Sequence, residues 1–215
     1  WGSKYVSISK PYETFLAQCA SGNLPAVSFI DPRFEDEGSG SSTDDHPHAD
    51  LRAGEYFLNQ TYNAITSSPS WPNTVFIINY DEWGGFFDHG PPPETRDAHE
   101  SPKLAKNWGQ RGFRTPTVMI SPFARRGHVS HRVYDHTSIL KMIEWRWGLA
   151  PLSVRDAAAN NIALDLDFSD PNTDAPAFNV PAAPQGEPCQ NSLPFGEETE
   201  WSGMRAKARR RGFAV

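Results

Sequence analysis

Two adjacent carboxylates directly after an apolar segment are the most chemically suggestive feature of the sequence. Asp81 and Glu82 follow residues 74–80 (TVFIINY), which are nearly all apolar and predict a central strand covered on both faces. In open α/β sheets, ligands bind beyond the carboxyl ends of such strands. Adjacent carboxylates repel each other unless cations neutralise them, and hard oxygens suit Mg²⁺, Ca²⁺, Mn²⁺ or Zn²⁺. The pair therefore indicates a metal site, with a solvated acidic turn as the alternative.

Three histidines are candidates for contact with a substrate. His46, His89 and His136 each follow an aspartate in the sequence, although neighbours in sequence do not have to touch. Imidazole can bind a metal, donate to a developing anion or transfer a proton near neutral pH. The alternative for each is a surface or capping role, and His136 could organise a helix start together with Asp135 and Thr137.

Motifs that supply a nucleophile or a phosphate-binding loop are absent. The sequence contains no GxSxG, no GxxxxGK[ST] and no GxGxxG pattern, so water is the only attacking group that the residues indicate. Seven tryptophans could line a sugar or lipid site, but Trp145 and Trp147 are expected to pack in the core.

The segments that must position these residues alternate between helical and extended patterns. Apolar residues at helical spacing predict helices at residues 12–20, 51–67 and 136–149. Short apolar runs predict buried strands at residues 24–30, 74–80 and 115–120. Asp50 can cap the second helix, after a long polar loop at residues 34–50. The order predicts an α/β fold with a mostly parallel sheet, which three strands do not complete.

Composition limits the classes of function. The 215 residues carry 20 Lys and Arg against 26 Asp and Glu, a formal net charge of −6, which argues against a nucleic-acid partner. No apolar run approaches the roughly 20 residues of a transmembrane helix. Cys19 and Cys189 form no metal or redox motif, and their pairing stays open.

Three longer stretches together resemble the bacterial phosphoesterase family that contains phospholipases C and a related acid phosphatase. They are residues 44–93, which include YDEWGGFFDH and the prolines that follow, then RTPTVMISPFARRG, and then VYDHTSILKMIEWRWGLAPLSVRDAAANNIALDLDF. The matching segments lie between Asp44 and Phe168, more than half of the chain. The resemblance implies an alkaline-phosphatase-like α/β/α sandwich and hydrolysis of phosphate esters, most directly phospholipase C activity on phosphodiester head groups.

The resemblance also implies roles for the candidate residues. Asp81 and Glu82 match metal ligands of the family, so a divalent ion (Ca²⁺, Mg²⁺, Mn²⁺ or Zn²⁺) is the expected cofactor. His46 and His89 match active-site positions that contact the phosphate or the leaving group, and His136 matches a characteristic family position. Phospholipids or other phosphate esters are the expected substrates, and members of the family are typically secreted or periplasmic.

The sequence lacks two motifs that the family pattern includes. The family's Glu-Asn metal motif and its Ser or Thr nucleophile are not found, and the chain opens without Met. We therefore expect residues 1–170 to be the C-terminal part of a phosphoesterase domain, which lacks its N-terminal half and is inactive alone. Residues 171–215 are expected to be an irregular Pro-rich segment with a basic tail. The alternatives are an acid phosphatase acting on monoesters, or a secreted, non-catalytic binding module.

Overall fold

The computed structural model describes residues 6–34, 42–46, 49–98, 108–182, 206 and 209–210. The chain divides into two compact units. Unit 1 comprises Trp1–Pro25 and Ala64–Pro176, and unit 2 comprises Ala26–Asn63 and Ala177–Val215. The expected division at residue 170 concerns the extent of the phosphoesterase domain and stays a prediction.

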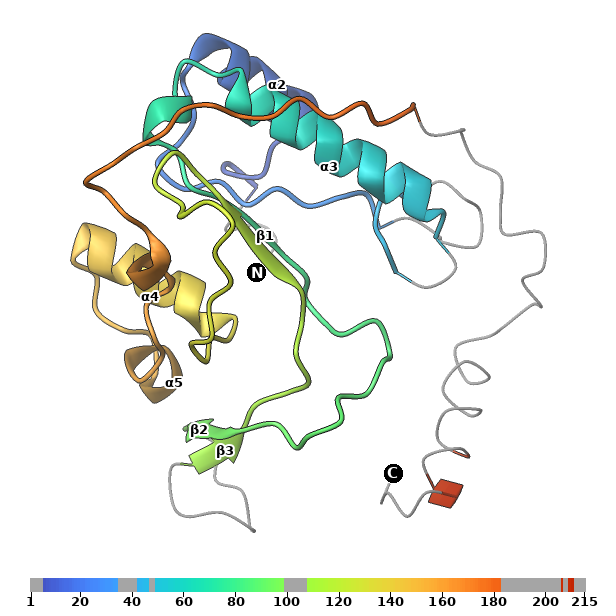
Figure 1. Ribbon diagram of the computed structural model, residues 1–215, viewed down its shortest axis with the longest axis vertical. Helices are drawn as coiled ribbons and strands as arrows, with labels where there is room; N and C mark the ends of the chain where they lie inside the picture. The colour runs from blue at the N-terminus through green and yellow to red at the C-terminus, as the bar shows by residue number, and fades with distance from the viewer. Residues whose placement is uncertain are drawn as a thin grey trace. The chain divides into compact units, whose positions relative to one another are not determined.

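Helices form where the apolar spacing predicted them: α2 (Tyr12–Ser21), α3 (Leu51–Thr66) and α4 (Thr137–Trp147), as Figure 1 shows. Asp50 caps α3 as predicted, because its Oδ1 accepts the backbone N–H of Arg52 at 3.1 Å. The helix α2 ends at Gly22, whose φ of 71° favours glycine. A Cβ at this position would also lie 3.0 Å from Cβ of Pro69, so the turn needs glycine for space as well.

Two short antiparallel strand pairs form the sheets of the described residues. The strand β1 (Phe76–Asn79) pairs with β4 (Thr117–Ile120), and β2 (Glu94–Arg96) pairs with β3 (Trp108–Gln110). Thr117 Oγ1 donates to Asn79 Oδ1 at 2.7 Å, which fixes the end of β1 where the acidic turn begins. These elements make a small α/β structure, and the predicted parallel pairing is not found within the described part of the chain.

Several sequence-based expectations about burial are wrong. Residues 24–30 form no strand, and the Val27 and Phe29 side chains are 39% and 74% exposed. Both β1 and β4 form, but their side chains are half-buried or exposed rather than covered on both faces. Trp145 and Trp147, expected in the core, are 57% and 43% exposed. An apolar run with strand propensity becomes a buried strand only where other segments cover it.

Buried side chains and one hydrogen bond hold distant segments of unit 1 together. The core includes Phe15 and Cys19 of α2 together with Trp71, which follows α3. Trp71 Nε1 donates to the carbonyl oxygen of Thr173 at 2.8 Å, so the end of unit 1 is tied to the segment before β1. Cys189, the other cysteine, lies outside the described residues.

Three short helical elements complete unit 1: η2 (Trp71–Asn73), α5 (Val154–Ala157) and η3 (Ile162–Asp165). The helix α4 packs against α5 and η3, and α5 lies next to β2 (Figure 1). None of the described helices is both long and apolar enough to cross a bilayer. Residues 171–182 carry no helix or strand, and most of the basic tail lies outside the described residues.

Candidate active site

The acidic pair lies in a turn at the end of β1. The side chain of Asp81 is exposed, and Glu82 Oε2 accepts the backbone N–H of Gly84 at 2.7 Å. Gly84 and Gly85 have φ of 68° and 79°, values that glycine adopts without strain. The expected sharp turn after the carboxylates is therefore confirmed.

His136 connects the start of α4 to the same turn. Its Nε2 lies 3.1 Å from the carbonyl oxygen of Tyr80, the residue directly before Asp81. A carbonyl oxygen can only accept, so Nε2 carries the proton of this hydrogen bond. The contact places His136 beside the acidic turn, and it favours a role in holding that turn in place.

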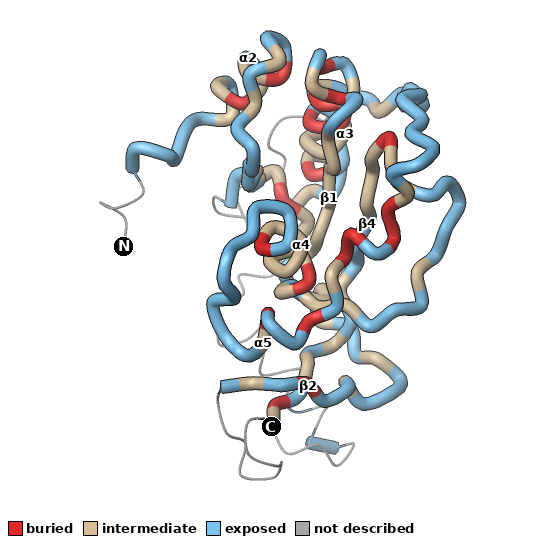
Figure 2. The backbone as a smooth tube through the Cα atoms, turned by 90° about the vertical axis from the view of Figure 1, so that its left-hand side faces the viewer, coloured by how far each residue is buried: buried red, intermediate tan, exposed pale blue. Residues whose placement is uncertain are grey.

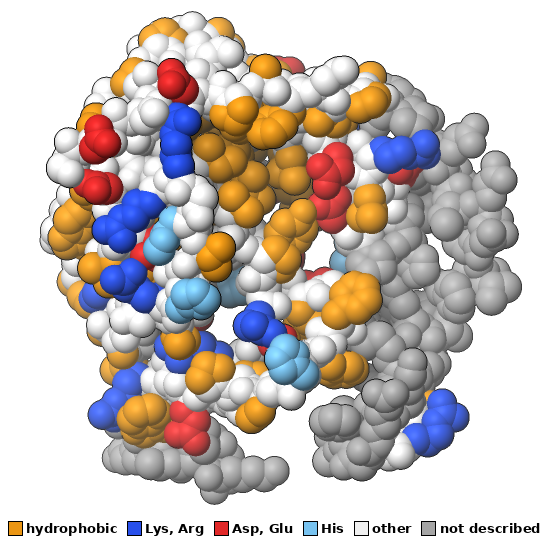
Figure 3. Space-filling model, in the orientation of Figure 1, with side chains coloured by type: hydrophobic (Ala, Val, Ile, Leu, Met, Phe, Trp, Pro, Cys, Tyr) orange, Lys and Arg blue, Asp and Glu red, His pale blue; other side chains and the backbone are white. Residues whose placement is uncertain are grey.

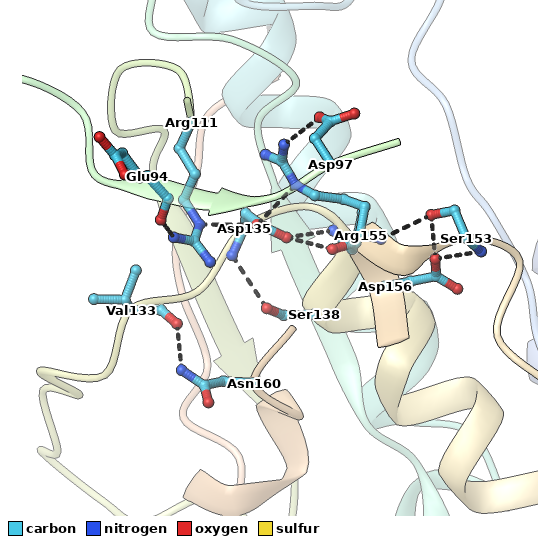
Figure 4. A network of polar contacts seen from close by, with 11 residues as sticks. Glu94, Asp97, Arg111, Val133, Asp135, Ser138, Ser153, Arg155, Asp156 and Asn160 are labelled. Carbon is cyan, nitrogen blue, oxygen red and sulfur yellow. Dashed lines mark hydrogen bonds and ion pairs between the residues drawn. The ribbon is translucent and has the colours of Figure 1, made fainter. Parts of the chain in front are cut away.

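Asp135 caps α4. Its Oδ1 accepts the backbone N–H of Thr137 at 2.9 Å and also the Thr137 hydroxyl. Its Oδ2 lies 2.9 Å from Nε of Arg111 and 3.4 Å from Nε of Arg155, which Figure 4 draws around it. The Asp135 side chain is only 11% exposed, so these two guanidinium groups balance a charge that is largely shielded from water.

The two arginines extend this network to other elements of unit 1. Arg111 donates to the carbonyl oxygen of Glu94 in β2 at 2.8 Å, and Arg155 of α5 donates to Asp97 at 2.9 Å. Burial raises the pKa of Asp135, but the hydrogen bonds from Thr137 and Arg111 outweigh it, so the pKa is lowered overall. The network thus anchors the residue that precedes His136.

His89 lies at a small pocket beyond the glycine turn. The pocket has a volume of about 220 Å³. Its walls include His89, Asp88, Arg114 and the prolines at positions 91–93. Arg114 binds Asp88 with its backbone N–H and its Nε, both at 2.9 Å. The side-chain hydrogen bond lowers the pKa of Asp88 and raises the pKa of Arg114.

Aromatic side chains fix the loop between the acidic turn and His89. The ring centroid of Phe113 lies 5.2 Å from Trp83 and 5.3 Å from Phe87. The indole Nε1 of Trp83 is buried and has no hydrogen-bond partner. Phe86, by contrast, is 80% exposed. On the face drawn in Figure 3, histidines and basic side chains (Lys or Arg) lie among exposed apolar groups.

The structure brings some of the predicted site residues together and leaves others apart. Asp81, Glu82, His89 and His136 all belong to unit 1, and the first two share a turn with the His136 contact. His46 is exposed and belongs to unit 2, so its membership of the same site stays a prediction.

The carboxylates of Asp81 and Glu82 are suitable metal ligands, but two of them are too few for a complete metal site. No group of three or more His, Cys, Asp or Glu side chains that could hold an ion occurs within the described residues. A divalent ion with oxygen ligands usually takes more from its protein than two neighbouring carboxylates, unless water or substrate fills its shell. The described residues therefore do not fit a complete metal centre.

Comparison with known proteins identifies the family. Residues 3–150 match the Phosphoesterase family. Non-specific phospholipase C6 of Arabidopsis thaliana is 33% identical over 199 residues, and the match covers 84% of this chain. Phospholipase C B of Mycobacterium tuberculosis (strain ATCC 25618 / H37Rv) is 32% identical over 198 residues and 81% of this chain. Hemolytic phospholipase C of Pseudomonas aeruginosa is 32% identical over 158 residues and 66% of this chain.

The matched relatives are much longer proteins. The match covers 38% of the Arabidopsis protein, 37% of the mycobacterial protein and 22% of the Pseudomonas protein. They come from both plants and bacteria, so the family is broader than the bacterial group that the sequence resembles. The family match spans more than half of the chain and includes the acidic turn, the pocket and the start of α4. The chain belongs to the phosphoesterase family that includes the phospholipases C.

Proposed function

We propose that this chain forms part of an enzyme that hydrolyses phosphate esters, most directly the phosphodiester of a phospholipid head group. The observation that carries the proposal is the segment from Tyr80 to His89. It joins an acidic turn to a histidine-lined pocket, in a chain about one-third identical to proteins named phospholipase C.

The pocket suits a small polar group better than a whole lipid. Its volume of about 220 Å³ lies below the roughly 300–1,000 Å³ of pockets that enclose drug-sized ligands. Arg114 is already bound to Asp88, so the imidazole of His89 is the lining group best able to bind a phosphoryl oxygen. An exposed imidazole can also give a proton to a leaving oxygen near neutral pH.

A divalent ion is part of the proposal. Asp81 and Glu82 offer the hard oxygen atoms that Ca²⁺, Mg²⁺, Mn²⁺ and Zn²⁺ accept. We propose that the remaining ligands come from the N-terminal part of the family's domain, because two neighbouring carboxylates offer few ligands to a divalent ion. His46 is proposed to contact the phosphate or the leaving group, as its match to the family implies.

The N-terminal part of the domain is the proposed source of the nucleophile as well. The relatives' greater length and the half-exposed faces of β1 and β4 support a chain that is completed by further structure. The complete fold would then be the α/β/α sandwich with a mostly parallel sheet. Location in the periplasm or outside the cell is a further proposal, which fractionation of the source cells would test.

Hydrolysis of two chromogenic esters tests the proposed function. The 215-residue chain, with and without added divalent ions, should turn over p-nitrophenylphosphocholine and p-nitrophenyl phosphate slowly or not at all. A hybrid that carries this chain in place of the matching segment of the mycobacterial phospholipase C B should hydrolyse the phosphocholine ester. Preference for the monoester would favour a phosphatase, and a folded but inactive hybrid would favour a binding module.

A further inference from the structure

Ten consecutive exposed residues run from the last turn of α4 to the first residue of α5. Residues 145–154 read WRWGLAPLSV, and Figure 2 shows this connection among the pale blue, exposed parts of the chain. The large apolar side chains in it are 43–80% exposed, with Leu152 the most exposed: Trp145, Trp147, Leu149, Leu152 and Val154. So many exposed apolar groups in one segment are unusual for a surface that faces only water.

Buried polar groups hold this segment in shape. Gly148 ends α4 with φ of 64°, and the backbone N–H of Leu149 donates to the carbonyl oxygen of Glu144 at 2.9 Å. The Asp156 carboxylate accepts the backbone N–H of Leu152 at 2.6 Å and that of Ser153 at 2.7 Å. Glu144 and Asp156 are 7% and 1% exposed. The two carboxylates are therefore buried and the apolar side chains exposed, in a segment with fixed backbone contacts.

The charge of the segment suits a phospholipid surface. It contains one charged residue, Arg146, and no carboxylate, although the whole chain has a net charge of −6. The Arg146 guanidinium lies 5.4 Å from the ring centroid of Trp147. Tryptophan rings settle at the boundary between acyl chains and head groups, and an arginine beside them can reach the lipid phosphates.

We propose that residues 145–154 dock the protein onto a phospholipid membrane, with Trp145, Trp147 and Leu152 inserted at the interface. The proposal rests on the proposed function, because an enzyme that cleaves phospholipids must meet them at a membrane surface. Apolar insertion dominates, so binding to uncharged phosphatidylcholine vesicles depends little on ionic strength.

Sedimentation with phosphatidylcholine vesicles tests the docking. The full chain should bind at both low and high salt, and phosphatidylcholine brominated in its acyl chains should quench its tryptophan fluorescence. The triple variant Trp145→Ser/Trp147→Ser/Leu152→Ser should bind about tenfold more weakly or worse, because vesicle binding scales with buried apolar area. Far-UV circular dichroism and thermal melting establish that both proteins are folded.

A matched control removes exposed apolar side chains elsewhere. Val27, Phe29 and Phe34 are 39%, 74% and 62% exposed, and Val27→Ser/Phe29→Ser/Phe34→Ser should bind vesicles like the unchanged chain. Equal loss of binding in both triple variants would overturn the proposal. Absence of vesicle binding by the unchanged chain would also overturn it. The same holds if the unchanged chain is a dimer and the Trp145 triple variant is a monomer, since a second copy of the chain would then cover residues 145–154.

Hydrolysis of water-soluble p-nitrophenylphosphocholine by the hybrid enzyme separates this proposal from the proposed function. The Trp145 triple variant should leave that rate unchanged and lower only the rate on vesicles. Vesicle binding without any hydrolysis would remove the proposed function and keep the docking surface. Hydrolysis without vesicle binding would keep the proposed function and remove the docking surface.

Discussion

The imidazole Nε2 of His136 lies 3.1 Å from the carbonyl oxygen of Tyr80, across 56 positions of the sequence. This hydrogen bond ties the first residue before α4 to the last residue before the acidic turn. The Asp135 network then fixes that helix start to β2 and α5. The position of Asp81 and Glu82 therefore depends on side chains of other elements as well as on β1.

The protonation of His136 follows from its acceptor. Because a carbonyl oxygen accepts only, we expect the proton of the neutral His136 ring to sit on Nε2. Long-range ¹H–¹⁵N spectra of the labelled chain report which ring nitrogen is protonated. The exposed His131 serves as a comparison, and an unprotonated Nε2 in His136 would contradict the contact.

Replacement of Asp135 should weaken the fold considerably. Asp135→Asn leaves the Arg111 and Arg155 side chains, which are 15% and 23% exposed, without their shared carboxylate. We expect a loss of about 3 kcal/mol in the free energy of unfolding at pH 7, measured by urea denaturation. The matched change Asp170→Asn, at an exposed position, should lower the free energy of unfolding by about 0.5 kcal/mol or less.

The pH dependence of the Asp135 effect has a definite sign. A carboxyl group whose pKa is lowered by folding stabilises the protein above its ordinary pKa of about 3.9. That stabilisation is lost as the pH falls through the lowered pKa of Asp135. The difference between the Asp135→Asn variant and the unchanged protein should therefore shrink in acid. A difference that stays constant down to pH 2 would show that the charge of Asp135 is unimportant.

Glu144 should destabilise the fold at neutral pH. The neighbouring Asp156 carboxylate, together with burial, raises the pKa of Glu144. The stability it contributes is full below the ordinary glutamate pKa of about 4.3 and is lost as the pH rises through the raised pKa. Glu144→Gln keeps a donor toward Asp156, so it should raise the melting temperature at pH 8 and leave it unchanged at pH 4. The exposed Glu55→Gln is the control, and a lower melting temperature at pH 8 would refute the argument.

Divalent ions should bind the isolated chain weakly. Two neighbouring carboxylates offer few ligands, so we expect dissociation constants of about 1 mM or weaker for Ca²⁺, Mg²⁺ and Mn²⁺ by isothermal titration calorimetry. Micromolar binding that Asp81→Asn abolishes would instead show that the chain completes a metal site alone.

The helices and the acidic turn could be predicted because their determinants are local. Apolar spacing and the Asp50 cap lie within a few residues of α3, and the glycines that follow Glu82 adopt the left-handed conformation that the turn requires. The prediction of a strand at residues 24–30 was wrong because a strand forms only with a pairing partner, which the local sequence does not identify. The direction of pairing between β1 and β4 is likewise decided by distant contacts.

The sequence did not reveal the residues that hold the site in place, because their partners are also distant in the chain. Arg111 lies 24 positions from Asp135 and Arg114 lies 26 positions from Asp88, and neither distance leaves a pattern in the sequence. The capping box from Ser153 to Asp156 is different, since the S-x-x-D spacing is a local signal for the start of α5. Asp156 also lies in the L-x-x-RD motif of the family resemblance.

The most direct test of the proposed phosphoesterase site is the rate of p-nitrophenylphosphocholine hydrolysis by the hybrid enzyme and its His89→Ala variant. If His89 contacts the phosphate or the leaving oxygen, its loss should lower kcat/KM about 100-fold or more. The exposed His131→Ala variant should keep the rate of the unchanged hybrid. An active hybrid whose kcat/KM is the same with and without His89 would contradict the account.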